Sequence, residues 1–401
     1  MKNFFKKKII VKKGIDFFLI YYKLKYFYAK IKCLFYLNII NKIQKKKFLN
    51  LIINNKKKKI KNKILNKTFC FNKEIIFNLF LLDEIEKINI LIIFIRKILI
   101  NLSELEYKTI FYKNEIKKFT TLGYLYLYWN NLLNIDHELL FNFKFKNSIL
   151  SNNIFNFIKN GKNKILNIMK NLLKFKKIDE NTLNENQNNN LSLVFFLISI
   201  NNHLNIFFDS INSLFLNYKN AIYLNYTFNF NFFLNSFKNN YFKIVKNLEN
   251  LISINNNKNI ENIFLESIYF IKINLNYFRK IISLIKINKK KIYLINFKKE
   301  KIFKNIKKYL IFKKINFSDC NIIIKKIYDY IKTKNISIYN ITLYELNKIN
   351  KIFKKDFFYK ISFEYKFKKN NFLGSDNYQQ ILKSIQRAKY LFNKFLIRFK
   401  I

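Results

Sequence analysis

INILIIFIRKILINL, residues 88–102, carries apolar side chains at a spacing typical of a helix. The positions that form the pattern are Ile88, Ile92, Ile95, Leu99 and Leu102, which advance by four, three, four and three residues. Residues three and four apart lie on the same side of an α-helix, so the segment has one apolar face. Similar spacings recur along much of the chain. The sequence therefore predicts a mainly α protein.

The chain also carries a large positive charge. Its 401 residues include 76 Lys and Arg against 24 Asp and Glu, which gives a net charge of +52. The commonest residues have codons rich in A and T, so nucleotide bias explains part of the lysine excess. A polyanion suits such a chain, because bound phosphates neutralise its self-repulsion and release counterions. Nucleic acid is the favoured partner, RNA rather than a DNA operator, and an anionic membrane surface comes second.

Two asparagine-rich segments divide the chain. TLNENQNNN at 182–190 and SINNNKNIEN at 253–262 lack periodicity, and asparagine favours turns, so both are interpreted as linkers. The predicted regions are a basic, helical N-terminal extension at 1–181, the linker at 182–190, a second helical region with lysine runs at 191–335, and an RNA-binding module at 336–401.

Motifs of catalysis and metal binding are not evident. Glycines stand only at positions 14, 123, 161 and 374, which excludes the glycine-rich phosphate loops and the nucleophile elbow. Cys33, Cys70 and Cys320 are too scattered for a zinc pair. We therefore expect no enzymatic activity, no catalytic residue, no metal and no cofactor.

The acidic and histidine residues support the same expectation. Asp136, His137 and Glu138 adjoin in sequence, and adjacent residues do not face one another on a helix, so they are interpreted as a surface helix start. His203 stands among asparagines and is interpreted as incidental. A solvated helix face is the interpretation for three acidic residues, Asp83, Glu84 and Glu86.

Residues 377–395 read NYQQILKSIQRAKYLFNKF, and the last 23 residues of the chain hold one of its three alanines, two of its four arginines and three of its five glutamines. Helical spacing places one apolar face on Ile381, Ile385, Ala388, Phe392 and Phe395. The opposite side carries a basic strip of Lys383, Arg387, Lys394 and Arg398. Asp376 followed by Gln379 resembles a capping box, so the helix should start near Asp376 or Asn377.

This terminal helix resembles a known family. Residues 380–391, QILKSIQRAKYL, are similar to the C-terminal helix of the bacterial-type small-subunit ribosomal protein eighteen, whose pattern is roughly Q-L-x-R-A-I-x-R-A-R-Y-L. Residues 340–353 resemble the first helix of that family more loosely. The resemblance implies a small helical ribosomal-protein module at the C-terminus, preceded by a long, mostly helical, basic extension.

The resemblance also implies a function and partners. We expect a structural constituent of the small subunit of an organellar ribosome, in a plastid rather than a mitochondrion. Its partners would be small-subunit ribosomal RNA and neighbouring ribosomal proteins, protein six among them, with no small-molecule substrate. The family pattern has an arginine where Lys389 stands, and segment 354–376 lacks the expected proline and arginine. The implied RNA-binding residues are Lys383, Arg387, Lys389, Tyr390, Lys394 and Arg398, with Lys366, Lys368 and Lys369 as substitutes for the middle contacts.

A rival function is an organelle-encoded, membrane-associated scaffold. Residues 191–208 form a membrane-like stretch that Asn201, Asn202 and His203 interrupt. The stretch is interpreted as a buried helix, and residues 191–218 would be the insertion segment under the rival. An RNA-processing enzyme would need a catalytic acidic motif that the sequence does not show.

Overall fold

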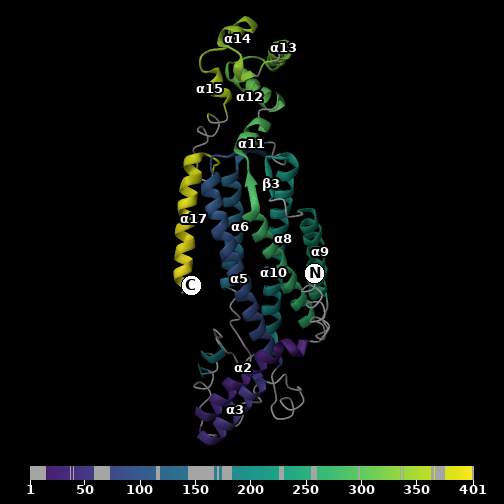
Figure 1. Ribbon diagram of the computed structural model, residues 1–401, viewed down its shortest axis with the longest axis vertical. Coiled ribbons are helices and arrows are strands. Elements are labelled where there is room, and N and C mark those ends of the chain that lie inside the picture. The colour runs from purple at the N-terminus through teal and green to yellow at the C-terminus, as the bar shows by residue number, and fades with distance from the viewer. Residues whose placement is uncertain are drawn as a thin grey trace. The chain divides into compact units, whose positions relative to one another are not determined.

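The computed structural model confirms that the chain is mainly α (Figure 1). Among the described residues, the strands are short and belong to two antiparallel pairs. The prediction of a small C-terminal module behind a long extension is wrong, because elements from all parts of the chain pack together in two compact units. The structure describes residues 15–36, 38, 40–57, 73–113, 118–142, 167–168, 171–173, 183–224, 230–253, 260–296, 299–334, 336, 338–362, 365 and 375–399.

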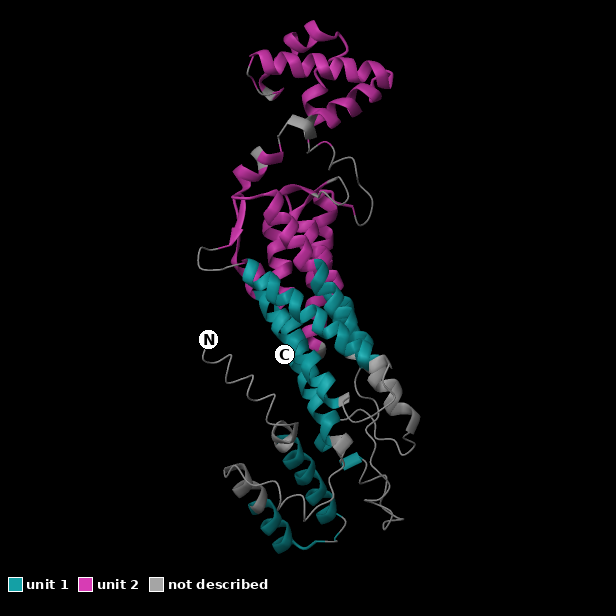
Figure 2. Cartoon of the chain, turned by 90° about the vertical axis from the view of Figure 1, so that its right-hand side faces the viewer, with its two compact units in different colours: residues 1–94, 133–206, 231–279 teal, residues 95–132, 207–230, 280–401 magenta. Residues whose placement is uncertain are grey.

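Each unit is assembled from separate stretches of sequence (Figure 2). Unit 1 comprises residues 1–94, 133–206 and 231–279, and unit 2 comprises residues 95–132, 207–230 and 280–401. Helices α5 (Lys73–Glu106), α6 (Leu122–Asn142), α8 (Leu183–Asn217) and α10 (Ile260–Leu284) each contribute one part to each unit. The predicted division at residues 182–190 and 335 stays a prediction, although 183–190 lie at the start of α8.

The segment at residues 88–102 lies within α5, as predicted. Ile88, Ile92, Ile95 and Leu99 all have 0% of their surface exposed. The four-three spacing thus identified the buried face of this helix correctly. Burying such side chains is the main favourable contribution to folding, at about 1.5–3 kcal/mol for each.

The elements described in unit 1 are all helices. It contains α2 (Ile15–Tyr36), α3 (Lys42–Lys57), α9 (Phe230–Ser253) and the relevant parts of α5, α6, α8 and α10. Leu24, Phe27 and Ile31 of α2 form a small core that packs against α3. A network of ion pairs ties α5 to α10, because Glu84 accepts from both Lys272 and Lys87.

Unit 2 begins with the end of α5 and an antiparallel hairpin. Strands β1 (Ile110–Lys113) and β2 (Lys118–Thr121) pair with Ile110 opposite Thr121. Helix α6 follows at once, and a Cβ added at Gly123 would lie 2.5 Å from the Cα atom of Tyr107 and 2.7 Å from the carbonyl oxygen of Ser103. Glycine is therefore required there for close backbone approach.

A second pair of strands and an aromatic core complete this part of unit 2. Strands β3 (Ile222–Leu224) and β4 (Ile285–Ile287) are antiparallel. Trp129 of α6 has 0% exposure and packs between Tyr126 and Phe207, at ring distances of 5.5 and 5.7 Å. Buried Arg96 donates to the side-chain oxygen of Asn130 at 3.3 Å.

The remaining helices of unit 2 include a group with its own hydrophobic core. That core is formed by α12 (Lys299–Phe312), α13 (Phe317–Lys334), the 3-10 turn Ile338–Asn340, α14 (Leu343–Ile349) and α15 (Phe357–Ile361), and α11 (Lys289–Asn296) precedes α12. Asp356 accepts from Tyr309, and it pairs with Lys313 and Lys360. The hydrogen bond from Lys360 lowers the pKa of Asp356 to about 2, and Lys313 and Tyr309 add to the effect.

The C-terminal helix α17 (Tyr378–Phe399) shows the predicted amphipathic arrangement. Ile381, Ile385, Ala388 and Phe392 are buried. The side chain of Asn377 accepts from the backbone N–H of Gln379 at 2.9 Å. Asn377 is thus the residue that caps this helix, and the predicted start near it is confirmed.

Candidate functional site

Both histidines of the chain lie in unit 1, and one of them contacts a buried aspartate. Asp136 of α6 and His203 of α8 are 67 residues apart in sequence, yet Asp136 Oδ2 lies 2.8 Å from His203 Nδ1. Ser199 of α8 donates from its hydroxyl to Asp136 Oδ1 at 2.9 Å. The side chain of Asp136 has 0% exposure, whereas that of His203 has 17%. We call Asp136 and His203 the histidine–aspartate pair.

The helices place these groups by simple periodicity. Ser199 and His203 are four residues apart on α8, so they lie on the same face, and both reach Asp136. Neither α6 nor α8 contains a lysine or an arginine, although the chain has 76 such residues. His203 is therefore the basic side chain of α8 that lies within hydrogen-bond distance of Asp136.

The contact to Asp136 favours one tautomer of the His203 imidazole. An ionised carboxylate can only accept hydrogen bonds, so the Nδ1–Oδ2 contact suits the tautomer that carries its proton on Nδ1. The neutral ring then has its lone pair on Nε2, which makes no hydrogen bond to any described residue. With the carboxylate held by Ser199 as well, His203 is oriented to take up or release a proton at Nε2. Ser199 donates to Asp136 rather than to His203, so the three groups are not a nucleophilic triad.

Buried amides lie elsewhere in the interior of unit 1. Asn240 of α9 donates to Asn274 of α10 at 3.0 Å, and both are buried. Tyr241 donates to Asn202 of α8 at 3.2 Å, which ties α9 to the helix that carries His203. These bonds tie α9 to α10 and to α8.

Sequence reasoning missed this arrangement. Asp136 and His137 were expected at an exposed helix start, but both have 0% exposure and lie in the second half of α6. His203, which was interpreted as incidental, contacts Asp136. Glu138 is exposed, as expected, and accepts from Asn134 at 2.7 Å. The pair could have been noticed in the sequence because the two segments that carry it lack lysine but contain an aspartate and a histidine.

The three acidic residues of α5 were interpreted as a solvated helix face, and the structure differs for two of them. Glu84 is buried and paired with lysines, and Asp83 accepts from the hydroxyl of Tyr22 at 2.7 Å. Burial, followed by that hydrogen bond, raises the pKa of Tyr22. Glu86 is exposed as expected. Among the residues that the structure describes, no cluster of three His, Cys, Asp or Glu side chains could hold a metal.

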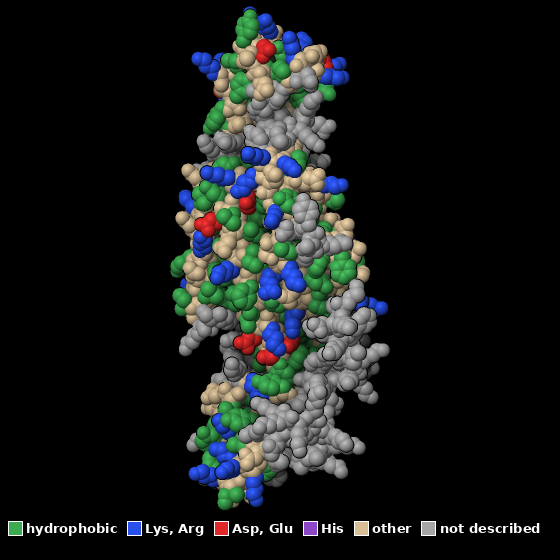
Figure 3. Space-filling model, viewed as in Figure 1, with side chains coloured by type: hydrophobic (Ala, Val, Ile, Leu, Met, Phe, Trp, Pro, Cys, Tyr) green, Lys and Arg blue, Asp and Glu red, His purple; other side chains and the backbone are tan. Residues whose placement is uncertain are grey.

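The residues predicted to bind RNA lie mainly along α17. Lys383, Arg387, Tyr390 and Lys394 are exposed, and Figure 3 shows basic side chains scattered over the visible face of the molecule. Lys389 instead pairs with Glu104 at 2.7 Å. Arg398 belongs to α17, while Lys366, Lys368 and Lys369 lie outside the described residues. A binding role for these residues stays a prediction.

The membrane-like stretch forms the main part of α8. Residues Ser192–Asn217 are long and apolar enough to cross a membrane by length and composition, but 56% of the window is buried inside the protein. Leu193, Leu197, Ile200 and Leu204 all have 0% exposure. Such burial is typical of the core helix of a helical bundle, so the structure gives the membrane-scaffold alternative no support.

The architecture is similar to that of several solved enzymes. The chain superposes on β-carboxy-cis,cis-muconate cycloisomerase from Acinetobacter calcoaceticus with a TM-score of 0.65 and 9% identity, covering 94% of this chain and 96% of that one. The 3-carboxy-cis,cis-muconate lactonizing enzyme from Pseudomonas putida gives 0.69 and 8%, covering 93% and 94%. A variant of EDDS lyase with bound fumarate gives 0.65 and 11%, covering 94% and 86%. No protein-family model and no curated protein sequence matches the chain.

This likeness corrects the functional expectations. The resemblance to ribosomal protein eighteen is wrong, because nearly the whole chain shares the fold of lyases and cycloisomerases. A structural role in the ribosome, with ribosomal RNA and protein six as partners, is overturned with it. The expectation of a non-enzymatic protein without a small-molecule substrate is also contradicted, since these neighbours are all enzymes. The organellar location stays a prediction.

Proposed function

We propose that the chain is an enzyme that acts on a small unsaturated carboxylate, or on a carboxylate that becomes unsaturated. It removes or adds a proton at the carbon next to the carboxylate. His203 is the general acid and base, and Asp136 is its positioning residue. The observation that carries the proposal is the contact of 2.8 Å between His203 Nδ1 and a carboxylate with 0% exposure. That contact leaves Nε2 as the reactive nitrogen.

The similar structures support the substrate class. Three of them are described as acting on a carboxymuconate or holding fumarate, and both compounds are carboxylates conjugated to carbon–carbon double bonds. The net charge of +52 also favours an anionic substrate, because a positive field raises the local concentration of anions.

In the proposed reaction, His203 carries out both proton transfers. In elimination, His203 Nε2 takes the proton from the carbon next to the carboxylate, and the carbon–hydrogen electron pair becomes the new double bond. The substituent on the neighbouring carbon leaves with its bonding electrons, and the imidazolium returns the proton to that group or to water. In addition the steps run in reverse. Asp136 stabilises the imidazolium formed midway, and such acid–base catalysis contributes about 100- to 10,000-fold.

The test is proton NMR of the full chain with candidate substrates. Fumarate with ammonium, fumarate with ethylenediamine, and 3-carboxy-cis,cis-muconate are incubated separately, and the vinylic proton signals are followed. We expect at least one of them to lose vinylic signal in proportion to enzyme concentration. His203→Gln should reduce that rate by at least 100-fold. The matched control is Glu138→Gln, which removes an exposed carboxylate two residues from Asp136 and should leave the rate unchanged.

Two outcomes contradict the proposal. The absence of turnover for all three substrate sets by a folded chain would argue against the substrate class. Turnover that survives in His203→Gln would remove the histidine–aspartate pair from the chemistry, even if the substrate class were right.

A further inference from the structure

The interior of unit 1 contains buried polar atoms that make no hydrogen bond within the described part of the chain. Two of them are Oδ1 of Asn201 on α8 and Nδ2 of Asn274 on α10. Asn201 has 1% of its surface exposed and Asn274 has 0%, so neither side chain reaches bulk water. Buried polar atoms without a partner are costly and therefore rare in folded proteins. These two atoms thus favour a partner that the chain itself does not supply.

Contacts with α9 place the two asparagines at one level of the helix bundle. The side-chain amide of Asn240 on α9 donates to Oδ1 of Asn274 at 3.0 Å. The next residue of α9, Tyr241, donates from its hydroxyl to Oδ1 of Asn202 at 3.2 Å. Because Asn240 and Tyr241 are adjacent, α8 and α10 meet the same turn of α9. Asn201 and Asn274 therefore lie within about one helical turn of each other along the bundle.

Both asparagines interrupt apolar stripes that face the core. The residues three or four positions before and after them are apolar and have 0% of their surface exposed: Leu197 and Leu204 on α8, and Ile271 and Phe278 on α10. Residues at these spacings share a helix face, so the two amides point into the core that those side chains fill. An amide is more compact than the aliphatic and aromatic groups one turn away, so this level of the core contains less side-chain volume.

The two atoms are chemically complementary. Oδ1 of Asn201 accepts hydrogen bonds and Nδ2 of Asn274 donates them, yet neither bonds the other. A water molecule accepts and donates at once, and a buried water makes about two to four hydrogen bonds. An ion suits the place less well, because it would lose its hydration without gaining a charged partner from these amides.

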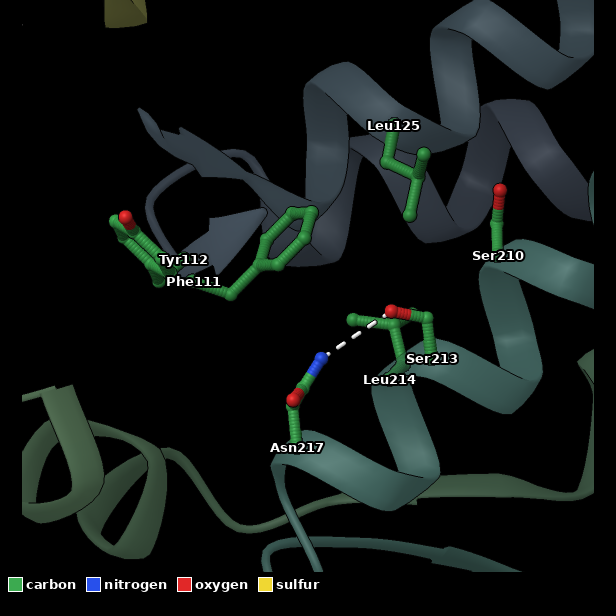
Figure 4. A pocket seen from close by; sticks show the side chains of 7 residues that line it. All are labelled: Phe111, Tyr112, Leu125, Ser210, Ser213, Leu214 and Asn217. Atoms are coloured by element: carbon green, nitrogen blue, oxygen red, sulfur yellow. Dashed lines mark hydrogen bonds between the residues drawn. The ribbon is translucent and has the colours of Figure 1, made fainter. Parts of the chain in front are cut away.

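The pocket in Figure 4 shows the contrasting case. It lies in unit 2 between β1, α6 and α8, has room for about one water molecule and is partly open to solvent. There the amide of Asn217 already donates to the hydroxyl of Ser213 at 3.2 Å. None of the side chains that line this pocket carries a buried polar atom without a partner. The pocket therefore gives no reason to expect a tightly held molecule, whereas the core of unit 1 does.

We propose that one ordered water molecule bridges Asn201 and Asn274 in the core of unit 1. It accepts a hydrogen bond from Nδ2 of Asn274 and donates one to Oδ1 of Asn201. With the bond from Asn240 to Asn274, the water completes a hydrogen-bonded chain from α9 through α10 to α8. The inference is independent of the proposed reaction, which uses His203 and Asp136.

The experiment counts long-lived internal waters by oxygen-17 magnetic relaxation dispersion, to which the rapidly exchanging surface waters do not contribute. The unmodified chain is compared with Asn201→Leu, with the double variant Asn240→Leu and Asn274→Leu, and with the triple variant. The double variant removes Asn240 too, so that its amide is not left without an acceptor. The first two should each lose the signal of one water. The triple variant should also lose only one, because both sides hold the same molecule.

The matched control is Asn202→Leu, which removes an exposed amide next to Asn201 and should leave the signal unchanged. A triple variant that loses two waters would show two separate sites and overturn the bridge. No loss in any variant would overturn the water itself. If the variants do not fold, a crystal structure of the unmodified chain decides. A water oxygen within hydrogen-bond distance of both atoms supports the proposal, whereas a direct bond between the two amides, or no water between them, overturns it.

Discussion

Replacing Asp136 by asparagine should move the ring proton of His203 from Nδ1 to Nε2. The carboxylate accepts two hydrogen bonds, from Ser199 at 2.9 Å and from His203 at 2.8 Å. The amide of the variant has one acceptor oxygen and one NH₂ donor, so it can accept at only one of the two positions that the carboxylate oxygens occupy. The imidazole can respond by accepting from the amide at Nδ1, which places its own proton on Nε2 and removes the lone pair needed there.

The magnitudes follow from the burial of the site. Asp136 has 0% exposure, so a lost or mismatched hydrogen bond cannot be replaced by bulk water, and we expect a loss of about 1–3 kcal/mol in the free energy of unfolding. The catalytic rate should fall by about 100- to 10,000-fold, because the general base is then in the wrong tautomer. At about 1.36 kcal/mol for each factor of ten, this is a barrier increase of about 2.7–5.4 kcal/mol.

The assay for the tautomer is nitrogen-15 NMR of ring-labelled histidine. The chain contains only His137 and His203, so two ring spectra are expected, and His203→Gln assigns them. Glu138→Gln is the control, and it should keep the tautomer and the stability of the unmodified chain. If Asp136→Asn leaves the proton of His203 on Nδ1, the hydrogen-bonding argument is wrong, whatever the activity shows.

Three further results are expected. Glu84→Gln should lower the free energy of unfolding by about 1–3 kcal/mol in a denaturant titration, because it leaves Lys272 without its buried carboxylate partner, whereas exposed Glu86→Gln should have little effect. Gly123→Ala should lower the thermal midpoint markedly, since the added Cβ meets backbone atoms that cannot rotate away, and an unchanged midpoint would contradict that crowding. The pKa of Asp356 is about 2, below its usual 3.8, so its stabilising contribution is present above about pH 4 and is lost as the pH falls through about 2. The difference in urea midpoint between the unmodified chain and Asp356→Asn should accordingly shrink over that interval, and a constant difference would show that the carboxylate is not responsible.

The C-terminal helix shows why a local match misled the functional interpretation. The pattern on residues 380–391 was sufficient to predict an amphipathic helix with Ile381, Ile385 and Ala388 inside, and that part is confirmed. The same pattern suits any helix that packs one apolar face and exposes a basic one. A dozen residues therefore determined the local structure of α17, but they did not identify the protein that surrounds it.

By itself, the sequence determined the helical character of the chain and the inward faces of α5 and α17, because helical periodicity acts within one segment. Only the tertiary structure decided that Asp136 meets His203. Those groups come from segments far apart in sequence, and their contacts depend on how helices pack against one another. No spacing along the chain encodes that packing, since each helix presents its residues correctly whether or not the partner helix is beside it.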